Sequence, residues 1–155
     1  MEKTILRKAK MGDVNQIRRL INSFANEGKM LPVSLNMLYE RLRNFWVVEE
    51  NGRVIGCAAL KIVWKDLGEI RSIAISRKHQ GKGYGKMLVK KLLEEAKEIE
   101  LKKIFTLTYV PEFFEKLGFE KIIKSQLPHK VWSDCINCPK FPRCDETAML
   151  KVLKK

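Results

Sequence analysis

Residues 80–86, Gln-Gly-Lys-Gly-Tyr-Gly-Lys, form the stretch of this chain whose composition is most typical of ligand binding. Glycine at every second position leaves no Cβ atom to keep a ligand from the backbone. The apolar-rich stretch at 70–76 before these residues predicts a strand, and the residues after them predict a helix. A loop that joins a strand to a helix N-terminus offers converging N–H groups and partial positive charge to an anion. With Lys82 and Lys86 beside it, the loop is predicted to hold a phosphate-bearing cofactor.

The spacing of these glycines excludes two common phosphate-binding motifs. The P-loop pattern, G-x-x-x-x-G-K-S/T, does not fit residues 80–86. The dinucleotide fingerprint follows the first strand of a βαβ unit, whereas the elements before this loop predict an antiparallel meander. The cofactor therefore has to be identified from the rest of the chain.

A second group of potential ligands lies near the C-terminus, where Cys135, Cys138 and Cys144 form a C-x₂-C-x₅-C pattern close to His129. Three thiolates and one imidazole satisfy tetrahedral zinc, but this spacing is not that of a common zinc finger. A reducing cytoplasm disfavours a disulfide. We assign no metal here, and whether these cysteines bind zinc or are free thiols stays open. Cys57, in an apolar stretch, is predicted to lie in the core.

Hydrophobic periodicity, helix caps and turn residues predict the elements that position these groups. Asp13 and Ser34 are expected to cap helices, and Asn51-Gly52 is a strong hairpin signal. We expect strands at 4–8, 45–50, 53–63, 69–76, 102–108, 119–124 and 147–153, a turn at 64–68, and helices after residues 13 and 34 and at 84–99 and 111–117. This order predicts one mixed α/β domain of about seven strands over residues 1–155, with a Cys-rich loop at about 125–146.

The net charge of +13, from 31 Lys+Arg against 18 Asp+Glu, favours anionic partners. A solvated Lys/Glu-rich surface explains the charge equally well, and its scattered distribution gives no indication of nucleic acid binding. No apolar run reaches the roughly 18 residues of a membrane span. The N-terminus has no apolar core of a signal peptide, so we expect a cytoplasmic protein without a membrane partner.

The context of the glycine loop carries a family resemblance. A strand, the Q-x-x-G-x-G of Gln80, Gly83 and Gly85, an amphipathic helix, another strand and then FFEKLGF resemble the GNAT family of N-acetyltransferases. The resemblance runs from Thr4 to Leu153. It implies the GNAT fold, a mixed and mostly antiparallel sheet of about seven strands flanked by about four helices. It also implies acetyl-CoA as the co-substrate.

The same resemblance implies how the cofactor is held. The backbone of Ile73, Ala74 and Ile75 would pair with the pantetheine arm, whose amides mimic peptide groups. The pyrophosphate would be held by the backbone N–H groups of Gln80, Gly81, Lys82, Gly83, Tyr84, Gly85 and Lys86.

Glu69 matches the position where many members of the family keep their general base. An amine is mostly ammonium at neutral pH and must lose a proton before it attacks a thioester, and a positioned base contributes about 10²–10⁴-fold. Period two would place Glu69, Arg71, Ile73 and Ile75 on one face of their strand. The alternative is that Glu69 only pairs with Arg71 or a nearby lysine.

The group that often protonates the leaving thiolate in the family is a tyrosine, and Phe114 stands in its place in this chain. Tyr109 and Thr108, at the end of the preceding strand, are the substitutes within the chain. Solvent or the substrate ammonium is the alternative source of this proton.

The sequence LTYVPEFFEKLGF, followed by a short strand and QLP, resembles the acetyltransferase domain of bacterial N-acetylglutamate synthases. This implies acetylation of the α-amine of L-glutamate, a step of arginine biosynthesis, by direct transfer. A doubly anionic substrate needs cationic partners. Arg71 is the first candidate and Lys130 the second, and Arg18 and Arg19 are more readily explained as surface charge.

Two alternatives stay open at this stage. The acceptor could be another amine, such as a protein N-terminus, a lysine or a small amine, or the chain could be a non-catalytic module that binds CoA or a metal. The sequence leaves a homodimer and arginine feedback undecided.

Overall fold

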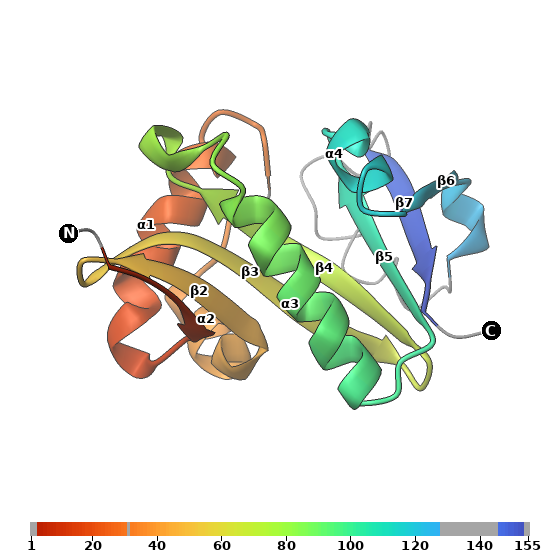
Figure 1. Cartoon of the computed structure of the whole chain (residues 1–155), viewed down its shortest axis with the longest axis horizontal. Helices are drawn as coiled ribbons and strands as arrows, with labels where there is room; N and C mark the ends of the chain where they lie inside the picture. Colours follow the sequence, from red (N-terminus) through yellow and green to blue (C-terminus); the bar gives the residue numbers. More distant parts are fainter. Residues whose placement is uncertain (1–2, 31, 128–145, 154–155) are drawn as a thin grey trace. The chain divides into compact units, whose positions relative to one another are not determined.

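The computed structural model describes residues 3–30, 32–127 and 146–153 of the chain (Figure 1). It divides into two compact units, of which the first contains Met1–Leu60 and Ile70–Glu95 and the second Lys61–Glu69 and Ala96–Lys155. The single domain expected from the sequence stays a prediction. No helix among the described residues is long and apolar enough to cross a membrane.

The strands follow one another in a single sheet order, β1-β2-β3-β4-β5-β7-β6. Their bounds are Thr4–Lys8 (β1), Phe45–Glu50 (β2), Arg53–Trp64 (β3), Leu67–Ile75 (β4), Lys103–Thr108 (β5), Glu120–Ile122 (β6) and Thr147–Val152 (β7). β4 and β5 are parallel, while β1 with β2, β2 with β3, β5 with β7 and β6 with β7 are antiparallel. With the helices α1 to α4, this confirms the predicted mixed sheet and the order of elements.

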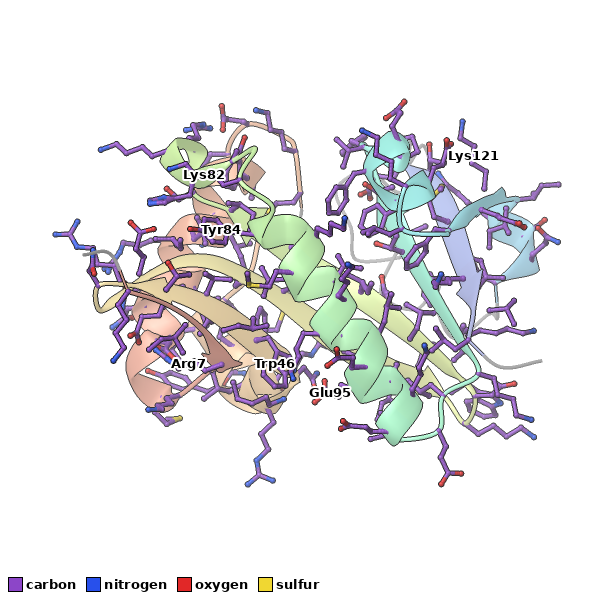
Figure 2. The ribbon with its side chains drawn as sticks, in the orientation of Figure 1. Arg7, Trp46, Lys82, Tyr84, Glu95 and Lys121 are labelled. Carbon is purple, nitrogen blue, oxygen red and sulfur yellow. The ribbon has the colours of Figure 1, made fainter. Side chains whose placement is uncertain are left out.

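The first unit contains α1 (Val14–Ala25), α2 (Leu35–Arg41) and α3 (Tyr84–Glu98) as far as Glu95. Side chains of α1 and α2 share one buried cluster with Val47 and Cys57 of the sheet. On the opposite face, a Cβ at Gly56 would lie 3.5 Å from the Leu88 side chain of α3. Trp46, next to Val47, likewise donates its indole N–H to Glu95 of α3 at 3.3 Å (Figure 2). The helices therefore cover both faces of this part of the sheet (Figure 1).

The start of α1 differs from the sequence prediction. Asp13 occupies the N-cap position but makes no side-chain cap to its own helix. Its carboxylate instead accepts two hydrogen bonds from Arg7, at 2.7 and 2.9 Å, and one from the Lys10 N–H at 2.7 Å. These bonds, led by that from Arg7, hold the pKa of Asp13 below its usual value. Ser34 does cap α2, because its hydroxyl accepts from the Met37 N–H at 3.1 Å.

The two hairpin turns gave different outcomes. Asn51 and Gly52 adopt φ of 51° and 82°, as a two-residue hairpin turn requires, so that prediction is confirmed. The turn expected at 64–68 is wrong in extent, because β4 already begins at Leu67. Leu67 and Gly68 are buried and pair with Lys103 and Ile104 of β5. Burial in a parallel ladder outweighed the turn preference of glycine at this point.

The second unit is built on β5, β7 and β6 with α4 (Pro111–Glu115). Its buried cluster includes Val63, Leu67, Phe105, Leu127 and Ala148. After α4 the chain turns at Gly118, which has a φ of 92°. The Lys151 ammonium of β7 lies directly over this glycine and donates to the Leu117 carbonyl at 3.0 Å. A glycine in this left-handed conformation is typical of the residue that follows the end of a helix.

Candidate active site

The glycine loop connects the short helix η3 (Arg77–His79) to the first turn of α3. Gly81 and Gly83 have φ of 77° and 89°, a region that other residues rarely adopt. No atom lies within 4 Å of the position where a Cβ would stand at either residue, so a ligand has room to approach the backbone. Lys82 is exposed and lies near Tyr84, where α3 begins (Figure 2). The loop therefore has the backbone form that a phosphate site needs.

The predicted loop residues all lie in this one segment of the first unit. The side chain of Gln80 donates back to the Ile75 carbonyl at 3.0 Å and so links the loop to the end of β4. The Met87 N–H donates to the Gly83 carbonyl at 3.0 Å, which closes the first turn of α3. The first bond attaches the start of the loop to β4, and the second attaches its end to α3.

β4 carries a kink that the sequence did not reveal. Ser72 has a φ of 55°, a left-handed conformation in the middle of a strand. Glu69, Arg71, Ile73 and Ile75 are all half-buried, whereas Ile70 and Ala74 between them are buried. Ser72 departs from this alternation, because it lies among the buried positions and is itself half-buried. The placement of the four residues on one face of the strand stays a prediction.

Cys57 of β3 contacts this kink from the core. Its thiol donates to the Ser72 carbonyl at 3.3 Å and accepts a hydrogen bond from the Ala74 N–H. Cys57 is fully buried, which raises the pKa of its thiol to about 12 and keeps the donor proton on the sulfur. The prediction that Cys57 lies in the core is confirmed, and its sulfur holds the backbone on both sides of Ile73.

Glu69 belongs to the second unit and is half-buried. It pairs with Phe105 in the parallel ladder between β4 and β5. Thr108 lies three residues after Phe105 on β5, which is about 10 Å further along the strand at the usual rise per residue. Its hydroxyl is buried and accepts from the Val110 N–H at 2.9 Å, while Tyr109 beside it is half-buried. The base candidate, Glu69, and the acid candidates, Thr108 and Tyr109, therefore lie at different positions along the strand direction in the second unit.

Phe114, in the position of the usual tyrosine, belongs to an aromatic cluster. Its ring is 1% exposed and makes edge contacts with Phe113 and Phe119, at centroid distances of 5.0 and 5.3 Å. The residue is thus a core side chain of the second unit.

Several residues singled out from the sequence carry no structural account. Lys130, His129 and the cysteines 135, 138 and 144 lie outside the described residues. Within the described ranges, no group of His, Cys, Asp and Glu side chains could hold a metal ion. Arg18 and Arg19 are exposed on α1, in agreement with the surface interpretation.

Comparison with known proteins decides what kind of protein carries these features. The profile of the acetyltransferase (GNAT) family matches residues 13–119. An uncharacterised N-acetyltransferase of Chlorobaculum tepidum is 39% identical over 97% of this chain and 97% of its own length. The chain belongs to the acetyltransferase (GNAT) family. This confirms the family resemblance, the fold and the assignment as an acetyltransferase.

Two further GNAT proteins point to amino acids. An amino-acid acetyltransferase of Mycobacterium tuberculosis is 37% identical over 84% of this chain and 76% of its own length. The N-acetylglutamate synthase of Neisseria gonorrhoeae, solved with coenzyme A and N-acetyl-glutamate, matches with a TM-score of 0.89 and 28% identity. That match covers 99% of this chain but 36% of the synthase, so the chain corresponds to about a third of that protein.

Sequence reasoning missed two features of this GNAT chain near the predicted cofactor residues. One is the Cys57 thiol at the kink of β4. The other is a contact between His79 of η3 and Glu50 of β2, at 3.3 Å and 29 residues apart. Neither contact follows a spacing pattern. The sequence signal for the second contact is that Glu50 and His79 each lie next to a turn that contains glycine.

Proposed function

We propose that this protein transfers the acetyl group of acetyl-CoA to the α-amine of L-glutamate. The observation that supports the proposal most is the similarity over 99% of the chain to a synthase whose structure contains coenzyme A and N-acetyl-glutamate. The relative named amino-acid acetyltransferase supports the same class of acceptor. The whole reaction is attributed to this chain as a proposal, because the chain covers only part of that synthase.

In the proposed reaction the amine attacks the thioester directly. Glu69 accepts a proton from the substrate ammonium, directly or through a water, and the amine nitrogen then forms a bond to the acetyl carbon. The C–S bond breaks, and the CoA sulfur leaves as a thiolate that takes up a proton. Tyr109 or Thr108 supplies this proton, or it comes from solvent or the substrate. Net, one ammonium and one thioester give an amide, a thiol and one proton.

The remaining residues of the proposal bind and orient the two substrates. Arg71, two residues after Glu69 on β4, is assigned to a carboxylate of glutamate, since a guanidinium binds carboxylates in a bidentate manner. Lys130 stays a second candidate. The backbone of 73–75 is assigned to pantetheine and that of 80–86 to the pyrophosphate, which the left-handed glycines of the loop support.

Such a reaction belongs to arginine biosynthesis, and we assign the protein to that process in the cytoplasm. Its partner in this proposal is a small acidic amino acid, with neither nucleic acid nor a membrane involved. A homodimer is possible, as the sequence left it, and light scattering measures whether it forms.

The proposal is tested by following CoA thiol release from acetyl-CoA against a panel of amines. The panel contains L-glutamate, L-aspartate, L-glutamine, L-lysine and a peptide with a free N-terminus. We expect the highest kcat/KM with L-glutamate. L-Glutamine is the matched control, because it has nearly the same shape without the side-chain charge. Thiol release with none of the acidic amino acids would refute the glutamate assignment, and release with lysine or the peptide alone would support another acceptor amine.

A further inference from the structure

We propose that Glu50 and His79 form a half-buried pair that fixes the glycine loop and thereby sets the affinity for CoA. Nε2 of His79 lies 3.3 Å from Oε1 of Glu50, and the two side chains are 18% and 13% exposed. Neither residue belongs to the segments assigned to the cofactor, so both are positioning residues. The inference rests on the proposed CoA site but not on the identity of the acceptor amine.

Glu50 is well placed to serve as a fixed anchor. It is the last residue of β2, and its backbone pairs with Thr4 of β1 on one side and Arg53 of β3 on the other. The tight turn at Asn51-Gly52 follows at once. Because two neighbouring strands hold the backbone of Glu50, its side chain starts from a fixed point and has little freedom to follow a moving loop.

His79 is the last residue of η3 and directly precedes the loop. The backbone N–H of His79 donates to the Ser76 carbonyl at 2.8 Å. The backbone N–H of Ser76 in turn donates to the Ile55 carbonyl of β3 at 2.8 Å. The imidazole also faces the ring of Tyr84 at the start of α3, with centroids 6.5 Å apart and planes tilted by 54°. The side chain therefore contacts the end of β2 and the beginning of α3, and the glycine loop runs from His79 to that same beginning of α3.

The contact matters because both partners are largely withdrawn from water. A buried carboxylate is costly unless a donor faces it, so an arrangement of η3 that moves His79 away leaves Glu50 poorly satisfied. The Nδ1 atom of His79 is buried and has no hydrogen-bond partner among the described residues, so Nε2 is the atom that orients the ring. Losing this contact lowers the fraction of molecules with a competent loop, and the apparent Kd for CoA rises in proportion.

An ion pair on η3 provides an internal control. Arg77 contacts Glu27 after α1, and its guanidinium lies 5.1 Å from the ring centroid of Phe24. The side chains of Arg77 and Glu27 are 57% and 41% exposed, against 18% and 13% for His79 and Glu50. Exposed ion pairs contribute little because water screens them. Removing the charge of Glu27 should therefore leave CoA binding nearly unchanged.

The test measures the Kd of CoA by titration calorimetry and the steady-state constants with acetyl-CoA. His79→Phe keeps an aromatic ring but removes the donor, and we expect the Kd to rise about tenfold, as for a lost hydrogen bond to a charged group. His79→Gln can again place an N–H toward Glu50 and should restore binding to within about threefold. Glu27→Gln should stay within about twofold. The KM for acetyl-CoA should follow the Kd, with kcat at saturation and the acceptor KM unchanged.

A double-mutant cycle of His79→Phe and Glu50→Gln separates a coupled pair from two independent effects. We expect the double variant to bind CoA about as weakly as His79→Phe alone. Additive effects, a Kd of His79→Phe within twofold of wild type, or equal losses in His79→Phe and Glu27→Gln would each overturn the proposal. If His79→Phe does not fold, the Glu50→Gln variant decides by its own Kd against Glu27→Gln. CoA binding is measured without an acceptor, so these outcomes stay distinct from a failure of the glutamate assignment.

Discussion

Replacing Asp13 by alanine tests how much of the stability depends on the ion network at the start of α1. The carboxylate is 8% exposed and accepts bonds of 2.7 and 2.9 Å from Arg7 and 2.7 Å from the Lys10 N–H. Removing one member of a buried ion pair costs about 3–5 kcal/mol. Arg7 is 20% exposed and keeps its bonds of 3.0 and 2.8 Å to Glu49. We therefore expect the lower end, a loss of about 3 kcal/mol in the free energy of unfolding.

The assay is urea denaturation followed by circular dichroism, with Asp13→Asn as a control that keeps the shape and one acceptor oxygen. The pH dependence adds a second criterion. The bonds from Arg7 and the Lys10 N–H depress the pKa of Asp13 below the ordinary value of 3.8. A depressed pKa means that the stabilisation is fully present above about pH 4 and is lost as the pH falls through the lower, folded pKa. The gap between wild type and Asp13→Asn should therefore be constant from pH 7 to 5 and narrow towards pH 3.

Two results would refute this reasoning. One is an Asp13→Ala variant within about 1 kcal/mol of wild type at pH 7, which is the level of an exposed ion pair. The other is a gap between wild type and Asp13→Asn that is the same at pH 3 as at pH 7.

Three further substitutions test the site. Gly83→Ala places alanine at a φ of 89°, which costs about 1–2 kcal/mol, so calorimetry should show weaker CoA binding than in Gly12→Ala, where the backbone is unstrained. Equal affinities would contradict the assigned role of the loop. Glu69→Gln should lower kcat by about 10²–10⁴-fold at pH 7 with the acetyl-CoA KM unchanged, and near-normal turnover at neutral and high pH would exclude Glu69 as the base. Phe114→Tyr buries a hydroxyl among aromatic rings and should destabilise the protein by about 1–3 kcal/mol in thermal melts, whereas an unchanged Tm would show that the hydroxyl finds a partner.

The features that the sequence could predict are those encoded by neighbouring residues. β1 and β2 were found with their observed bounds, and Ser34 and Asn51-Gly52 act as their local chemistry requires. The glycine loop belongs to the same class, because a left-handed backbone next to a helix N-terminus is written in its own residues.

Most of the features that the sequence could not predict depend on residues far apart in the chain. Asp13 is the exception, because the donors that bind its carboxylate in place of its own helix, Arg7 and Lys10, are only six and three residues away. A serine within an apolar strand has no signature of a kink, and the left-handed Ser72 is held by a thiol 15 residues away. The Glu50–His79 contact, 29 residues apart, likewise follows no periodicity. In each case tertiary contacts decided a conformation that local preference left undetermined.

The burial of Cys57 has a practical consequence for the chemistry of the other three cysteines. Thiol reagents react with the thiolate, and a fully buried thiol with a pKa of about 12 supplies almost none at neutral pH. Rapid alkylation of the native protein therefore reports on Cys135, Cys138 and Cys144 without a background from the fourth cysteine. Three fast equivalents would indicate free thiols, while a count that reaches three only after a chelator is added would indicate bound metal. The measurement can therefore be made on the wild-type protein, without first replacing Cys57.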